Sequence, residues 1–211
     1  MVYLRTTLVI LLGLFAVAGL TPRPAVAQTA ALKYVQTLGD RAILELTDKS
    51  ATDRQRVMRM RALLLESFDV PAVSQFVLGT YWRQTTEEER AEFIKLYSTV
   101  VSHTYAGLFK KYSGEQFKVQ RERAVDDETT VVYAQIIQPS GAEPIAIEIT
   151  TRTEPSGDYK AVDIKVEGIS MPLTHRKEYA SVIQRNNGKV SELIKLLKQK
   201  ADSLEAQTPS Q

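Results

Sequence analysis

The chain has 211 residues, no cysteine, and a formal net charge of +2 from 27 Lys and Arg against 25 Asp and Glu. The absence of cysteine excludes disulfides, thiol nucleophiles and thiolate metal sites. The near balance of charge argues against a nucleic-acid-binding protein, which normally carries a strong basic excess. The length suits one domain, or two small lobes, whose stability comes from packing alone.

The first 27 residues have the pattern of a secretory signal peptide. One early charge, Arg5, precedes an apolar run from about Leu8 to Leu20, and Ala25 and Ala27 occupy the small-residue positions of a cleavage site. A retained membrane anchor is the alternative, but the uncharged run is short for a span of about 20 residues. We therefore expect cleavage after Ala27 and an exported, soluble protein without net charge.

Helical periodicity runs through the next 85 or so residues, counted at 3.6 residues per turn. The spacing of apolar residues predicts helices over 30–48, from 53 to about 68, from 70 to 78 and from 87 to 112. Asp69 and Pro71 suit the start of the third helix, which Gly79 ends. Thr86 and Glu89 form a capping box for the fourth, the clearest helix in the chain.

The period then changes to two, which predicts β-strands. Four alternating runs are separated by turn-rich segments, and such short connections predict an antiparallel meander of four strands. One face is apolar, whereas the other carries Glu148, Asp163 and Lys165 and is expected to face water. Two helices follow, over 175–187 and 189–207. The fold class is therefore α+β, with helices covering one face of the sheet and enclosing an apolar cavity.

The domain organisation follows from this order of elements. We expect one domain over residues 28–205, in which 28–113 form a helical lobe and 114–205 form a lobe of the sheet and the last helices. Residues 206–211 are expected to be a flexible tail.

Few residues are suited to catalysis. His103 and His175 are the only histidines, they lie far apart, and neither belongs to a metal-ligand motif, so we expect no metal and no cofactor. His175 is expected to be exposed at a helix start. Asp163 lies within a strand and is the best candidate for a general base, but it falls on the wetter face of the sheet, where a cross-strand salt link is the better explanation. We expect a protein that is not an enzyme.

The segment Gly168-Ile169-Ser170-Met171-Pro172-Leu173 is apolar at a strand-to-helix corner, where a loop normally shows polar atoms to water. Either an apolar ligand or partner covers this corner, or the corner fills the protein's own core.

Two motifs resemble the MlaC-type periplasmic phospholipid-binding proteins, also called the toluene-tolerance family. The first motif is a Phe-Asp helix start, a Leu-Gly-x-x-Trp-Arg segment and a Thr-capped helix, and the second is a strand ending in Glu-Gly-Ile-Ser before a helix that carries an arginine. The matching residues are Phe68, Asp69, Leu78, Gly79, Trp82, Arg83, Thr86, Glu89, Arg90, Phe93, Tyr105, Tyr159, Lys160, Asp163, Ile164, Glu167, Gly168, Ile169, Ser170 and Arg176. The chain departs from the pattern at Tyr159, Pro172 and His175, and a related hopanoid-associated branch, HpnM, is an alternative.

The resemblance implies a monomeric periplasmic carrier. Such a carrier ferries a glycerophospholipid between an outer-membrane lipoprotein complex and an inner-membrane ABC transporter, which helps to maintain the lipid asymmetry of the outer membrane, and it binds no nucleic acid. A non-catalytic adaptor of the cell envelope and a small enzyme using Asp163 remain as alternatives.

A carrier must enclose the acyl chains, because exposing them to water costs about 0.8 kcal/mol per CH₂. The residues expected to line the cavity are Phe76, Tyr97, Val101 and Tyr105 above, Ile145, Ile147, Ile149, Val162, Ile164 and Val166 below, and Ile169 and Met171 at the mouth. Arg176 and Lys177 are expected at the headgroup, although pairing with Glu178 or Glu167 explains them equally.

Overall fold

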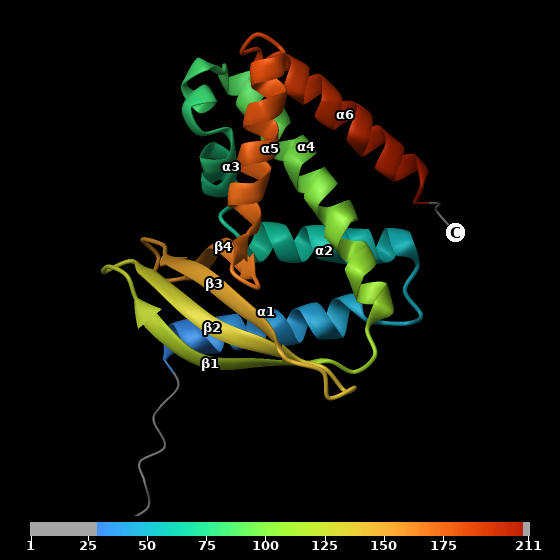
Figure 1. Cartoon of the computed structure of the whole chain (residues 1–211), viewed down its shortest axis with the longest axis vertical. Coiled ribbons are helices and arrows are strands. Elements are labelled where there is room, and N and C mark those ends of the chain that lie inside the picture. Colours follow the sequence, from blue (N-terminus) through green and yellow to red (C-terminus); the bar gives the residue numbers. More distant parts are fainter. Residues whose placement is uncertain (1–28, 209–211) are drawn as a thin grey trace, which may run out of the picture.

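A computed structural model describes residues 29–208, which form six α-helices, two short 3₁₀ helices and one sheet (Figure 1). The expected signal peptide and the last three residues of the expected tail lie outside this range. Within the described residues, no helix is long and apolar enough to cross a membrane.

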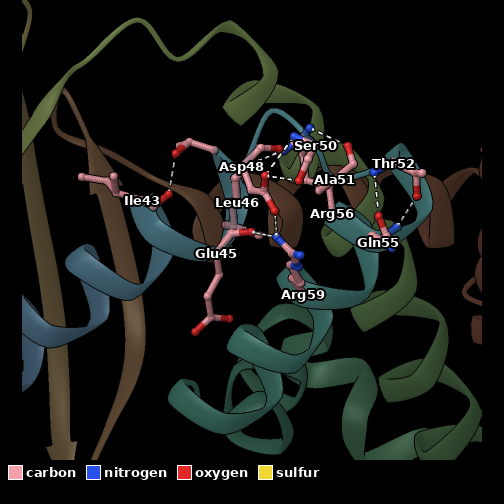
Figure 2. Close-up of polar contacts among 11 residues, drawn as sticks. Ile43, Glu45, Leu46, Asp48, Ser50, Ala51, Thr52, Gln55, Arg56 and Arg59 are labelled. Atoms are coloured by element: carbon pink, nitrogen blue, oxygen red, sulfur yellow. Dashed lines mark hydrogen bonds and ion pairs between the residues drawn. The ribbon is translucent and has the colours of Figure 1, made fainter.

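Helices α1 (Ala30–Leu46) and α2 (Asp53–Ser67) are joined by a connection that arginines hold in place (Figure 2). The Arg56 side chain, only 6% exposed, donates to the carbonyl oxygens of Leu46 and Asp48 and, at 3.2 Å, to that of Ala51. The bond to Leu46 satisfies a carbonyl that the end of α1 would otherwise leave unpaired, and the other two join Arg56 to the connection itself. Arg59 of the same helix adds bonds to the Glu45 carbonyl and the Asp48 carboxylate, so two arginines of α2 fix the connection.

Helix α3 (Val70–Leu78) starts as its sequence predicts. The Asp69 side chain accepts from the Ala72 N–H at 3.0 Å, and it also forms an ion pair with Arg152 of the sheet. The helix ends at Gly79, which has φ +57° and opens the 3₁₀ helix η1 (Gly79–Gln84). A Cβ atom at Gly79 would lie 2.9 Å from the Arg176 guanidinium, the flexible end of a side chain that can shift, so it is the positive φ that requires glycine here.

Helix α4 (Glu87–Ala106) has the predicted capping box of Thr86 and Glu89. It is shorter than predicted, because its last turn tightens into the 3₁₀ helix η2 (Gly107–Lys111). Such tightening is common at helix ends.

The sheet has five antiparallel strands in the order β1-β2-β3-β4-β5, not the predicted four. They are β1 (Gln116–Ala124), β2 (Thr129–Ile137), β3 (Ile145–Thr153), β4 (Tyr159–Val166) and β5 (Ile169–Ser170). The additional strand arises because Glu167 and Gly168 both adopt positive φ, which two-residue hairpin turns of type I′ require. The apolar corner thus begins as a hairpin.

The alternation predicted along β4 is wrong at one position, because a β-bulge interrupts the strand there. Thr150 pairs with Asp163, but Thr151 pairs with Ala161, so Val162 is the extra, unpaired residue. Ala161 is fully buried opposite Thr151, and it also bridges to Phe68. The sequence pattern places Val162, Ile164 and Val166 on one face of the sheet, but the bulge removes Val162 from this set.

The outer edge of β1 is partly covered by a side chain of α1. The Gln36 side-chain amide accepts from the Val119 N–H at 3.2 Å and donates to the Phe117 carbonyl at 3.3 Å. Gln36 thereby takes the place of a neighbouring strand at this position.

Helix α5 (Met171–Arg185) begins four residues before the predicted start at His175, because Ser170 caps it and Pro172 suits the first turn. Helix α6 (Val190–Ala206) follows after Gly188. Figure 1 shows α3 to α6 at one end of the molecule and the sheet at the other, with α1 along the sheet. One apolar cluster joins α3, α4, α5 and α6, and another joins α1 to the sheet, so each combines segments from both halves of the chain.

Candidate functional site

The inner face of the sheet gathers most of the residues expected below the ligand. Ile145, Ile147, Ile149, Ile164 and Val166 belong to one apolar cluster with α1, whereas Val162 does not. The register explains this, because Ile149 pairs with Ile164, and Ile147 with Val166. That these residues line a lipid cavity stays a prediction.

The residues expected above the ligand divide between two environments. Tyr97 is buried in the cluster of α3 to α6, Val101 packs against that cluster, and Tyr105 is partly buried. Phe76 instead lies at the surface, with 44% of its area exposed. The structure therefore separates Phe76 from Tyr97.

His175 connects α5 to two tyrosines of α4, in contrast to its predicted exposed position. Its Nδ1 atom lies 2.9 Å from the Tyr97 hydroxyl, and its Nε2 atom lies 3.3 Å from the Tyr105 hydroxyl. The imidazole also stacks on Tyr179, with ring centroids 6.0 Å apart. The sequence analysis did not predict this cluster. The only sign of it in the sequence is that His175 stands where the resembled family has an aromatic residue.

Burial keeps this cluster uncharged. It raises the pKa values of Tyr97, Tyr179 and Tyr105, and it lowers the pKa of His175. A neutral imidazole has one N–H donor and one acceptor nitrogen, so it donates to one tyrosine hydroxyl and accepts from the other. The arrangement binds α5 to α4 through a polar contact within apolar packing.

Asp163 supports the corner that starts α5. Its carboxylate accepts from the Ser170 hydroxyl at 2.9 Å, and the Ser170 Oγ atom in turn accepts from the Leu173 N–H at 3.2 Å. Burial raises the pKa of Asp163, and the bond from Ser170 opposes this shift. These contacts give Asp163 a role in positioning the corner.

The corner itself is divided between the interior and the surface. Pro172 is buried and Met171 is partly buried, whereas Ile169 is 64% exposed and Leu173 is 41% exposed. The apolar corner therefore both contributes to the packing and presents apolar side chains to solvent.

Arg176 and Lys177 lie one turn further along α5. The Arg176 guanidinium carbon lies 5.0 Å from the centre of the Phe76 ring, which is a cation–π distance. Within residues 29–208, no carboxylate forms an ion pair with either cation, so the pairing with Glu178 or Glu167 is not formed.

A separate pocket of about 170 Å³ lies between α2, α4 and α6. It is lined by polar groups that include Arg56, His103 and Lys110, and burial lowers the pKa of His103 there. The volume is below the range of about 300–1,000 Å³ usual for ligand pockets. Among the described residues, no group of His, Asp and Glu could hold a metal ion.

Comparison with known proteins gives a family match along most of the chain. The family model described as MlaC protein matches residues 36–199. The chain is 24% identical over 190 residues to the intermembrane phospholipid transport system binding protein MlaC of Haemophilus influenzae, covering 87% of this chain and 88% of that protein. It also resembles the solved structure of a phospholipid-binding protein from Ralstonia solanacearum in complex with a phospholipid. That match has a TM-score of 0.73 and 22% identity, and it covers 84% of this chain and 99% of the other.

Proposed function

The chain belongs to the MlaC protein family, and from this premise we propose that it is a periplasmic lipid carrier. It takes up a glycerophospholipid and shuttles it between an outer-membrane lipoprotein complex and an inner-membrane ABC transporter. This traffic helps to maintain the lipid asymmetry of the outer membrane.

The observation that carries the proposal is the apolar inner face of the sheet. Ile147 and Ile149 of β3 and Ile164 and Val166 of β4 meet there on adjacent strands. A sixteen-carbon acyl chain costs roughly 12 kcal/mol to expose to water, so a carrier needs a continuous apolar surface of this kind. The Haemophilus influenzae relative is named for phospholipid transport, and the Ralstonia solanacearum structure holds a phospholipid.

Loading requires movement at this face. The same isoleucines are packed against the chain's own side chains, and Ile147 and Ile149 are buried. A lipid reaches them when the residues that cover the inner face move apart from the sheet. Arg176 and Lys177, which form no ion pair within residues 29–208, are then suited to meet the phosphate of the headgroup. This function needs no catalytic group.

The decisive experiment identifies the ligand. The protein is purified after export, analysed by native mass spectrometry, and extracted for lipid identification. A bound glycerophospholipid supports the proposal, whereas a hopanoid would assign the protein to the related branch. A protein that carries no lipid, and takes none up from vesicles, would refute the carrier function.

A pair of substitutions on one strand tests the location. Ile147→Trp adds bulk on the inner face of β3, whereas Ala146→Trp adds the same side chain at the exposed neighbouring position. We expect Ile147→Trp to lose bound lipid while Ala146→Trp keeps it. Equal lipid content in two folded variants would place the ligand elsewhere.

A further inference from the structure

Three exposed apolar side chains come from α3, β5 and the first turn of α5, and α3 packs against α5. Ile169 lies in β5, two residues before the start of α5, and Leu173 lies in the first turn of α5. Phe76 of α3 lies under Arg176 of the next turn. Their exposed fractions are 64%, 41% and 44%. We call Phe76, Ile169 and Leu173 the apolar patch.

The structure holds this patch in place. The β4–β5 hairpin sets the direction of Ile169 through its pairing with Val166, and the Ser170 cap sets the start of α5. Asp163 in turn fixes Ser170 at 2.9 Å. The side chains are thus presented by regular elements, and little conformational entropy is lost when another surface covers them.

Positive charge accompanies the patch. Arg176 and Lys177 follow Leu173 by three and four residues, so they share its face of α5. Of the nearby acids, the Glu167 carboxylate accepts from the Ala146 N–H and the Asp163 carboxylate accepts from the Ser170 hydroxyl. Within residues 29–208, no carboxylate, including that of the adjacent Glu178, forms an ion pair with Arg176 or Lys177. The face therefore combines apolar side chains with unpaired cations.

We propose that the apolar patch docks the protein directly onto a phospholipid bilayer that contains anionic lipid. This inference rests on the proposed function, since a carrier that visits transport complexes in two membranes works beside a bilayer at each of them. Ile169, Leu173 and Phe76 enter the headgroup boundary while Arg176 and Lys177 meet lipid phosphates.

The size of the patch favours a bilayer over a protein partner. A stable protein interface buries about 800 Å² on each side, with some 20–30 residues. Three apolar residues and two cations are far fewer, but they suffice for weak and reversible attachment to an anionic surface. Reversible attachment also suits a protein that must leave the membrane with its cargo.

Flotation with vesicles tests the inference. The probes are vesicles of phosphatidylcholine alone and of phosphatidylcholine with phosphatidylglycerol, mixed with the full chain purified after export. We expect binding to the anionic vesicles that weakens as salt is raised. The double variant Ile169→Ser/Leu173→Ser should bind at least about tenfold more weakly, because both apolar contacts are lost.

The matched control is Leu44→Ser, a leucine of α1 that is 77% exposed and lies outside the patch. It should bind vesicles like the unaltered protein. Thermal unfolding confirms that each variant is folded. Absence of vesicle binding, or equal binding by the patch variant and the unaltered protein, would overturn the inference.

Lipid content measured on the same samples separates the two proposals. A protein that carries lipid but binds no vesicles would overturn the docking inference and leave the carrier function standing. A protein that binds vesicles through the patch but never takes up lipid would support docking and refute the carrier function.

Discussion

Replacing His175 with phenylalanine should destabilise the protein, because the Tyr97 hydroxyl loses its hydrogen-bond partner. Tyr97 is buried, and its hydroxyl lies 2.9 Å from the His175 Nδ1 atom. Phenylalanine keeps the ring but offers no partner to this hydroxyl. An orphaned buried polar group costs about 1–3 kcal/mol, and each kcal/mol lowers the melting temperature of a protein of this size by about 2–4 °C.

A double-mutant cycle isolates the contact. Tyr97→Phe removes the orphaned hydroxyl, so the double variant Tyr97→Phe/His175→Phe should lose less stability than the two single variants together. We expect a coupling free energy of about 0.5–3 kcal/mol from urea unfolding of the four proteins. Additive losses would show that the Tyr97–His175 bond contributes nothing and would refute the reasoning.

The pH dependence of the free energy of unfolding gives a second test of the role of His175. Burial lowers the pKa of His175 in the folded protein, and the nearby Glu178 charge opposes this shift. Because the folded pKa lies below the unfolded value of about 6.5, the stability from this group is complete above pH 6.5 and falls as the pH drops below it. The phenylalanine variant should lack this loss, so its stability difference from the unaltered protein should narrow between pH 7.5 and pH 5.

His103 is the control for this experiment, since burial also lowers its pKa. The variant His103→Gln retains His175 and should therefore keep the loss of stability at low pH that His175 causes. If the His175→Phe variant loses stability with falling pH as steeply as the unaltered protein, the assignment to His175 is wrong.

Three further substitutions test the fold by thermal or urea unfolding. Gly79→Ala should cost about 1–3 kcal/mol, because its φ is +57° and its Cβ would meet Arg176, whereas Gly107→Ala, with free space around it, should be nearly neutral. Arg56→Met should cost about 2 kcal/mol or more, because the Leu46 and Ala51 carbonyl oxygens lose their donor while the Asp48 carbonyl keeps the Ala51 N–H, and a loss under about 1 kcal/mol would contradict that role. Asp69→Asn keeps the helix cap and weakens the ion pair with the sheet, so a loss of only about 1 kcal/mol is expected, with Asp69→Ala costing more.

Local signals in the sequence predicted the elements well. The capping box of Thr86 and Glu89, the Asp69 cap and the Gly79 stop all depend on residues close in the chain, and each is confirmed. The four long strands and their antiparallel order follow from alternation and short turns. The α+β class could therefore be predicted without knowledge of tertiary contacts.

The errors arose where distant residues decide the local structure. Val162 alternates correctly in the sequence, but the pairing of Thr151 with Ala161 makes it a bulge. The start of α5 at Met171 depends on the hairpin before it and on the Ser170 cap. Nothing near His175 in the chain indicates that two tyrosines, 70 and 78 residues away, accept it as a partner.

Only part of the arrangement of the candidate site residues could be predicted, because some of it depends on contacts between distant segments. Period-two alternation correctly grouped Ile147, Ile149 and Ile164 on one face. It could not show that Phe76 would lie at the surface under Arg176, because that contact joins two helices about 100 residues apart.

The position of Gln36 at the edge of β1 bears on whether molecules of this protein aggregate through their sheets. An open strand edge invites a second molecule to add its own strand, and repetition of that step leads to fibrils. The Gln36 amide occupies part of the β1 rim, and the neighbouring Lys118, Arg121 and Arg123 add charge that opposes stacking of like molecules. The Gln36 bonds and these charges therefore oppose the addition of a second molecule's strand along β1.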